Sequence, residues 1–215
     1  MGVVVKWLAH SGFEIKADEK VIYVDLEEHC EPSEKADLIL VTHSHFDHCN
    51  PDKIKKVRKE GTVIIAPEDC ASKIGGNVKT LRAGEEMIIG NIRIKAVDAY
   101  NTKRFRSPGN PYHPKGFGVG YLIMVEGKTI YHAGDTDLIP EMRKLDRVDV
   151  ALLPTGGTYT MDDIEAADAA VAIKPKIVLS MHRWNTNPEE FKRMIKAKYK
   201  IKVLILKEGE EFQMV

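Results

Sequence analysis

The sequence lacks the features that mark a secreted or membrane-spanning chain. Its three cysteines, Cys30, Cys49 and Cys70, are an odd number without a CxxC pair, so no disulfide framework is expected. The stretch MGVVVKWLAHSGFEIKAD has no charged start, long apolar core or cleavage site of a signal peptide. No apolar run approaches the roughly 20 residues that cross a bilayer. These absences predict a protein of the reducing cytoplasm with no membrane partner.

An excess of either charge is also missing. Lys and Arg total 32 and Asp and Glu total 32, so the formal net charge is zero. A general nucleic-acid binder needs a basic footprint that this balance does not provide, although a local basic patch remains compatible with it. Gln213 is the only glutamine while Lys, Glu, Ile and Val are abundant, which favours a thermophilic source. We therefore expect no nucleic-acid partner.

Length and patterning predict one α/β (α+β) domain over residues 1–215. Short β-rich runs with tight turns precede strand–helix units, which is typical of two sheets packed together with helices outside. Predicted strands cover residues 3–9, 13–17, 21–25, 36–42, 62–66, 149–154, 177–181 and 203–207, with further hairpins turning at 90–91 and 126–127. Predicted helices begin after the caps Asn50 and Asn187, each followed by proline, near residue 68, and at a capping box of Thr160 with Asp163.

The densest group of metal-binding residue types follows an apolar strand run. VTHSHFDHCNPDK, residues 41–53, places His43, His45, Asp47 and His48 within six positions. Imidazole and carboxylate groups bind Zn, Mn and Fe. Strand-like alternation would turn His43 and His45 to one side, and the next two donors could serve a second direction, so one loop could feed two adjacent ions. The alternative is a polar helix-entry loop, which so tight a cluster disfavours.

Two ions need more donors than one loop supplies, and three candidates lie at other strand ends. His113 lies in NPYHPKGFGVGY, Asp135 follows a strand in HAGDTD, and His182 follows a strand in SMHRW. Each of these residues alone has an ordinary interpretation: a lone histidine is usually a surface or satisfied core residue, and Gly-Asp is a common turn. Together they supply the number and type of donors that a two-metal site would still lack.

These motifs resemble those of a known family. THSHFDH is similar to the H-x-H-x-D-H signature of the metallo-β-lactamase superfamily, whose fold is a four-layer αββα sandwich. YHAGDT and PTGGTYTMD, with the spaced later histidines, resemble its small single-domain branch of metal-dependent hydrolases, which includes the ascorbate-6-phosphate lactonase type. The resemblance extends from WLAHSGFEI to the final strand and names no substrate.

The resemblance implies roles for individual residues. It implies His43, His45 and His113 on one ion, Asp47, His48 and His182 on the other, and Asp135 bridging them. The two divalent ions would be Zn or Mn, and the hydroxide that they share would cleave an ester, lactone or phosphoester bond. Asp47 and His10 are the expected catalytic residues, because Asp47 could shuttle the proton of the nucleophile and His10 matches a histidine that this branch carries near the site. Iron stays open through an oxygen-reducing branch, which usually has a glutamate in place of His45 and an added flavin domain.

The loop YNTKRFRSPGNPYHPKG, residues 100–116, supplies the substrate prediction. It holds Arg104, Arg106 and Lys115 without an acidic residue, so it could clamp a phosphate or carboxylate, although a solvated loop fits nearly as well. Tyr159 is a further candidate for substrate contact. We therefore expect a small, anionic substrate.

Two other functions remain as alternatives. A nuclease of the same superfamily usually carries an RNA-binding insertion or a second domain, for which this chain has no room. A non-catalytic metal-binding protein with a decayed site is disfavoured because all seven ligand candidates are present. Metal content and salt-dependent retention on nucleic acid would separate these readings. A homo-oligomer is left open.

Overall fold

The structure is a computed structural model that describes residues 2–214. The chain divides into two compact units, each of which contains one large sheet. The first unit comprises residues up to 82 and from 206 onward, and the second comprises residues 83–205. The predicted α/β class is confirmed, with two seven-stranded sheets and four α-helices among the described residues. The single domain expected over 1–215 stays a prediction.

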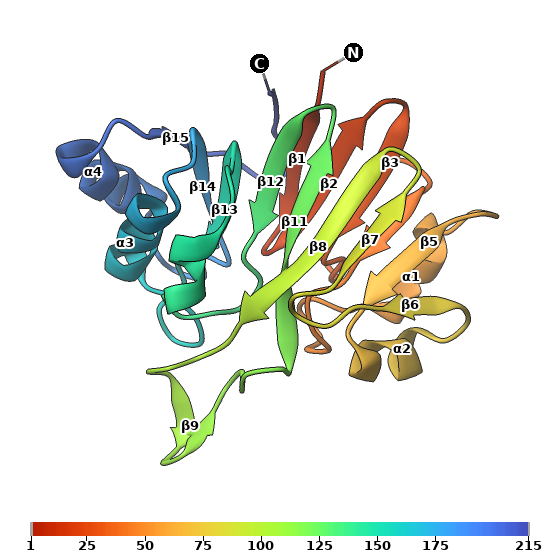
Figure 1. The fold of residues 1–215 in the computed structure, drawn as a ribbon, viewed down its shortest axis with the longest axis horizontal. Coiled ribbons are helices and arrows are strands. Elements are labelled where there is room, and N and C mark those ends of the chain that lie inside the picture. The colour runs from red at the N-terminus through yellow and green to blue at the C-terminus, as the bar shows by residue number, and fades with distance from the viewer. Residues whose placement is uncertain (1, 215) are drawn as a thin grey trace. The chain divides into compact units, whose positions relative to one another are not determined.

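The sheet of the first unit has the strand order β16-β1-β2-β3-β4-β5-β6. Figure 1 labels β1, β2, β3, β5 and β6 of this sheet. Its strands are β1 (Val4–Ala9), β2 (Gly12–Ala17), β3 (Lys20–Val24), β4 (Leu38–Leu40), β5 (Val63–Ala66), β6 (Val78–Thr80) and β16 (Glu211–Gln213). Its helices are α1 (Pro51–Val57) and α2 (Glu68–Ile74). Neighbours from β16 to β3 are antiparallel, and neighbours from β3 to β6 are parallel. The sheet therefore combines a meander with strand–helix units.

Local sequence accounts for the turns that lead to the first histidine cluster. Asp18 and Glu19 take positive φ values of 48° and 60°, which suits a tight hairpin between β2 and β3. Val24 pairs with Leu40 in the parallel β3–β4 ladder, so the segments after both strands leave the sheet at one edge. Asn50 then caps α1 by accepting the N–H groups of its first turn. This edge carries the loop of residues 41–48.

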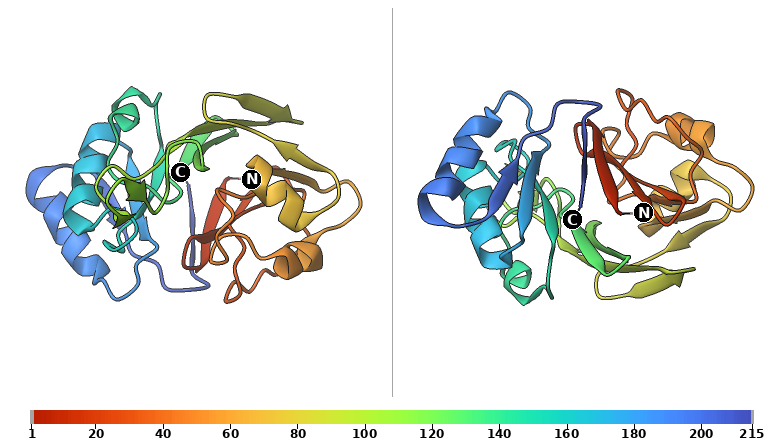
Figure 2. Two further views of the ribbon diagram at one scale, coloured as in Figure 1. Left: turned by 90° about the horizontal axis from the view of Figure 1, so that it is seen from below. Right: turned by 90° about the horizontal axis from the view of Figure 1, so that it is seen from above.

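The sheet of the second unit has the order β15-β14-β13-β12-β11-β8-β7. Its strands are β7 (Glu86–Ile89), β8 (Ile92–Ala99), β11 (Gly118–Val125), β12 (Lys128–His132), β13 (Val150–Pro154), β14 (Ile177–Met181) and β15 (Lys202–Leu204). A two-stranded ribbon joins β9 (Phe105–Ser107) to β10 (Asn110–Pro111), and η1 (Pro140–Lys144), α3 (Asp163–Ile173) and α4 (Pro188–Lys198) complete the unit. Both views of Figure 2 show α3 and α4 side by side.

The parallel part of this sheet brings three loops to one edge. Strands β12, β13 and β14 run parallel, with His132 opposite Leu152 and Pro154 opposite Met181. Their carboxyl ends precede Asp135, Gly156 and His182 respectively. Side chains distant in sequence therefore lie near one another at this edge, where ligands commonly bind in α/β sheets.

Most predicted elements are present, and the differences have physical reasons. Each predicted strand and helix overlaps an observed one. The capping box predicted at Thr160 is wrong, because Asp162 is the N-cap of α3 and accepts the N–H of Glu165 at 2.9 Å. Strands β6, β9, β10 and β16 were not predicted, since they are two or three residues long and depend on partners elsewhere in the chain. None of the helices in residues 2–214 is long and apolar enough to cross a membrane.

The first residue of α3 predicts a pH-dependent stability. Burial, together with the charges of Glu190 and Asp162, raises the pKa of Asp163 from 3.8 to about 6. The folded state holds this proton more tightly than the unfolded state. The resulting stabilisation of the folded state is therefore complete below about pH 4 and is lost as pH rises through about 6. Asp163→Asn should therefore increase the free energy of unfolding near pH 8 more than near pH 4, measured by urea denaturation.

The control for this prediction is Asp168→Asn, an exposed change on the same helix. The control should shift stability little at either pH. An equal gain for Asp163→Asn at both pH values would show that removal of the charge is not the cause.

Candidate metal centre

The first unit brings His43 and His45 into direct proximity. The Nε2 atom of His43 lies 3.1 Å from Nδ1 of His45, and the ring centroids are 4.7 Å apart. Two nitrogens bound at about 2.0–2.1 Å to one tetrahedral ion are about 3.3 Å apart. The observed separation therefore fits a pair of imidazoles that share a divalent ion.

The buried carboxylate of Asp25 holds the histidines of this loop in place through hydrogen bonds. Asp25 accepts hydrogen bonds from the Thr42 N–H at 2.8 Å and from the Thr42 hydroxyl at 2.7 Å, and its Oδ2 lies 2.8 Å from Nδ1 of His48. A carboxylate has no proton to give, so Nδ1 of His48 carries the proton and Nε2 has the lone pair. The same tautomer follows for His43, whose Nδ1 lies 3.0 Å from the Thr42 hydroxyl oxygen. Both rings are thereby oriented for metal binding through Nε2.

His10 and Asp47 form the remaining part of the first unit's cluster. His10 Nε2 lies 3.3 Å from Asp47 Oδ2, and a donor atom from each of His10, Asp47 and His48 lies within 4.8 Å of the others. The Trp7 indole N–H donates to the His10 carbonyl at 3.0 Å, which holds the turn after β1. The two residues predicted as catalytic therefore contact each other.

The second unit gathers His113, Asp135 and His182 around one oxygen. Asp135 Oδ2 lies 3.3 Å from Nε2 of His113 and 3.2 Å from Nε2 of His182. All three side chains are buried. A carboxylate oxygen that close to two imidazole nitrogens fits a donor that shares an ion with each of them.

Asn101 has the same role for His113 that Asp25 has for His48. Its Oδ1 accepts the backbone N–H of His113 at 2.8 Å and lies 2.9 Å from Nδ1 of the same residue. Its Nδ2 donates to Asp137 at 3.1 Å and to the Tyr159 carbonyl at 2.9 Å. The amide orientation is thus determined by its donors and acceptors, and His113 presents Nε2 to Asp135.

Backbone strain coincides with these clusters. His10, Asp25 and His182 have φ values of 48°, 50° and 48°, in the left-handed region that non-glycine residues rarely adopt. Such conformations cost of order 1–3 kcal/mol each and persist where the surrounding structure imposes them. The surrounding structure therefore holds these three residues in strained conformations that direct their side chains into the clusters.

The four predicted substrate residues differ in their surroundings. Arg104 is paired with Asp137 at 2.7 Å and with Glu165, and its Nε donates to the Gly157 carbonyl at 2.8 Å. Lys115 is paired with Glu141 at 2.7 Å. In contrast, Arg106 is exposed with its guanidinium 5.1 Å from the centre of the Tyr112 ring, and Tyr159 is 37% exposed.

The two residues that orient His48 and His113 were not predicted from the sequence. Asp25 ends the apolar run VIYVD and Asn101 follows β8, so each is a polar residue at a strand end. That signal was present in the sequence, but many strand ends carry such residues. Only the contacts with His48 and His113 distinguish these two.

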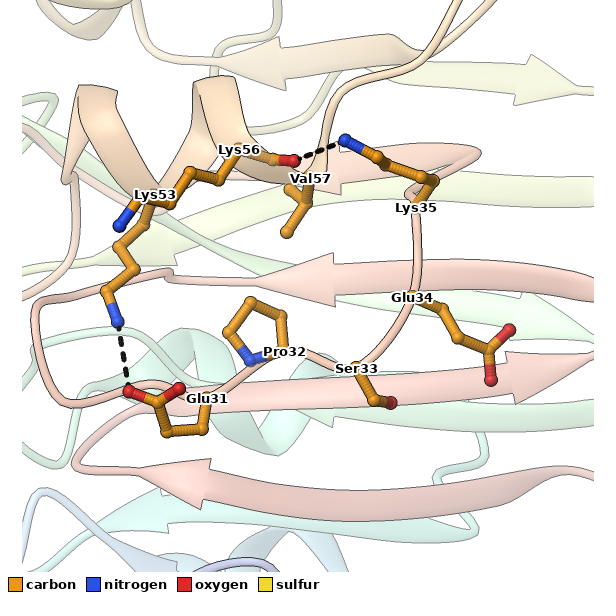
Figure 3. A pocket seen from close by; sticks show the side chains of 8 residues that line it. All are labelled: Glu31, Pro32, Ser33, Glu34, Lys35, Lys53, Lys56 and Val57. Carbon is orange, nitrogen blue, oxygen red and sulfur yellow. Dashed lines mark hydrogen bonds and ion pairs between the residues drawn. The ribbon is translucent and has the colours of Figure 1, made fainter.

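A separate hollow in the first unit is lined by lysines that hold α1 in place. It has a volume of about 290 Å³ and lies between the loop of residues 31–35 and α1 (Figure 3). Lys53 donates to the Cys30 carbonyl at 2.7 Å and pairs with Glu31 at 3.4 Å, and Lys35 donates to the Lys56 carbonyl at 2.7 Å. The lysines thus anchor α1, which begins just after the histidine loop.

Comparisons with known proteins agree on one family. Residues 4–182 match the family model described as a beta-lactamase superfamily domain. A metal-dependent hydrolase of Thermococcus kodakarensis is 37% identical over 99% of this chain and 100% of its own length. A solved structure from Parabacteroides distasonis, assigned as a metal-dependent hydrolase, is 37% identical with a TM-score of 0.89 and coverage of 97% and 94%. A metallo hydrolase from Ignicoccus hospitalis is 27% identical with a TM-score of 0.79 and covers both chains fully.

Removal of the Asp25 carboxylate tests its positioning role. In Asp25→Asn the amide nitrogen can face the His48 Nδ1–H, donor against donor, so the ring loses its fixed orientation. We expect metal affinity to fall about 10–100-fold, measured by competition with a chromophoric chelator. Asp52→Asn, an exposed change in α1 of the same unit, is the matched control. Unchanged affinity in a folded Asp25→Asn protein would contradict the assignment.

Proposed function

Because the chain belongs to the metallo-β-lactamase superfamily and is a metal-dependent hydrolase, we propose that it binds two divalent ions and cleaves an ester, lactone or phosphoester bond of a small anionic substrate. The proposed ligands are His43, His45 and His113 for one ion, Asp47, His48 and His182 for the other, and Asp135 for both. Zn or Mn suits this set of imidazole and carboxylate donors best, and the donors also accommodate Fe.

The observation that carries the proposal is the position of Asp135. One of its oxygens lies 3.3 Å and 3.2 Å from the Nε2 atoms of two buried histidines. A buried carboxylate between two imidazoles would be a costly arrangement without a positive charge to hold it. The 3.1 Å contact between His43 and His45 likewise supports the binding of an ion by residues of the first unit.

Once bound by these residues, divalent ions would supply Lewis-acid chemistry and would lower the pKa of bound water toward neutrality. Asp47 accepts the proton of the attacking water at Oδ2, and His10, 3.3 Å away, takes up or returns that proton. Asp25 and Asn101 keep the Nδ1 protons of His48 and His113 in place, so these rings do not compete for the transferred proton.

Substrate contact is proposed chiefly for Arg106 and Tyr159, which are exposed. An exposed guanidinium can bind a carboxylate or phosphate with two hydrogen bonds. Arg104 and Lys115, whose charges are matched by carboxylates, contribute by holding their segments in shape. Because carboxylates already neutralise two of these three cations, the remaining charge suits a small anion better than a polymeric one.

Loss of one proposed ligand should remove activity without unfolding the chain. His45→Ala should lower kcat/KM by at least about 100-fold and reduce the bound metal from about two ions per chain, because one ion loses a donor. The readouts are elemental analysis and turnover on the best substrate from a screen of lactones, phosphomonoesters, phosphodiesters and thioesters. His29→Ala, an exposed histidine in the same unit, is the control. Normal turnover of a folded His45→Ala protein would refute the metal assignment.

Metal removal should affect both activity and stability. Chelation should abolish turnover and lower the melting temperature, because an ion that binds only the folded state stabilises it by mass action. Addition of Zn or Mn should restore both quantities, and the metal that restores turnover most fully at equal occupancy identifies the better cofactor. A chelated protein, shown to be metal-free, that keeps full turnover would exclude a metal-dependent reaction.

A further inference from the structure

Three aromatic rings of the second unit form a continuous row that begins beside His182. The row consists of Trp184, Tyr159 and Tyr112. The Trp184 ring lies 5.7 Å from the His182 ring and 6.3 Å from Tyr159, and Tyr159 lies 4.8 Å from Tyr112 in an edge-to-face arrangement. Trp184 is 53% exposed and Tyr159 is 37% exposed. A large apolar surface is therefore presented to solvent next to a proposed metal ligand.

Exposure of Trp184 is maintained at a conformational cost. Its φ is 47°, a left-handed value that is unfavourable for so bulky a residue. The turn of residues 182–184 also requires Gly156, because a Cβ there would lie 2.6 Å from Cδ1 of Trp184 and 2.5 Å from the His182 carbonyl oxygen. Strained backbone that displays a large apolar side chain is typical of binding sites.

Hydrogen bonds of Asn101 link the row to His113, a second proposed ligand. The amide nitrogen of Asn101 donates to the Tyr159 carbonyl at 2.9 Å, while its amide oxygen lies 2.9 Å from Nδ1 of His113. Tyr159 and His113 thus share one buried partner, and the row is fixed relative to both histidines that flank Asp135. Rigid aromatic rings that adjoin reactive groups bind flat apolar groups at low cost in conformational entropy.

We propose, on the basis of the hydrolase function proposed above, that the row binds an aryl group of the substrate and makes the enzyme selective for aryl over alkyl substrates. The planes of Trp184 and Tyr159 are 62° apart, so the aryl ring packs face-on against one and edge-on against the other while the scissile bond lies toward His182. Contact with two aromatic rings supplies the selectivity. Arg106, 5.1 Å from the centre of the Tyr112 ring, places a cation at the far end of the row.

The test compares two non-hydrolysable anions, benzylphosphonate and methylphosphonate, on the metal-loaded enzyme. They carry the same charged group and differ by the ring, so their ratio of Kd values isolates ring recognition. Calorimetry should show benzylphosphonate binding about ten-fold more tightly than methylphosphonate. The protein has two tryptophans, Trp7 and Trp184, so a fluorescence change that is specific to benzylphosphonate and absent in Trp184→Phe reports Trp184.

Variants decide whether the row is responsible. Trp184→Ala and Tyr159→Ala should each bring the ratio of the two Kd values toward one, and Trp184→Phe should keep most of it. Tyr199→Ala, which removes an exposed ring at the end of α4, should leave the ratio unchanged. Equal affinity of the wild type for both anions, or an unchanged ratio in Trp184→Ala and Tyr159→Ala, would overturn the proposal. A loss of the ratio in Tyr199→Ala would overturn it too.

A hydrolysis measurement separates this proposal from the proposed function. With benzyl phosphate and methyl phosphate, which share the anionic group and release alcohols of similar acidity, Trp184→Ala should reduce kcat/KM about ten-fold for the benzyl ester only. Equal losses for both esters would overturn ring selectivity while hydrolysis itself stands. Ring-selective binding in an enzyme that hydrolyses no ester, lactone or phosphoester would instead refute the proposed function and leave the aryl site supported.

Discussion

Two of the clustered histidines, His48 and His113, depend on a buried hydrogen-bond acceptor beside the ring. Asp25 lies 2.8 Å from Nδ1 of His48, and Asn101 lies 2.9 Å from Nδ1 of His113. An imidazole can bind a metal through either nitrogen, so the acceptor determines which nitrogen keeps its proton and which faces the ion. Without these acceptors the rings could rotate or change tautomer, and the donor atoms would no longer be directed toward one another.

Sheet topology explains why the acceptors lie where they are needed. Parallel neighbours end at the same edge, so Asp25 after β3 reaches the loop after β4, although the two segments are separated in the chain. The same reasoning applies to Asp135 and His182, which follow parallel strands of the other sheet. Asp25 and His182 have left-handed φ values of 50° and 48°, and the paired strands that precede them hold these unfavourable conformations in place.

The second unit combines two kinds of surface beside its proposed ligands. Carboxylates neutralise Arg104 and Lys115, and their segments are thereby held in place. Aromatic rings beside His182 remain exposed. A hydrolase obtains its chemistry from the buried polar donors and its selectivity from the exposed surface around them, so the two can change independently in related chains.

Residue types and short-range spacing were sufficient to predict the histidine loop after a strand, the hairpins and two of the helix caps, because each depends on neighbours within a few positions. The partners of those residues were not predictable. Asp25 behind His48, Asn101 behind His113 and β16 beside β1 are pairings across long stretches of chain, which local periodicity does not encode. The exposed state of Trp184 belongs to the same group, since it results from a strained turn packed against Gly156. These features arise only when strand pairing brings distant segments together, because hydrogen bonding and close packing act between neighbours in space.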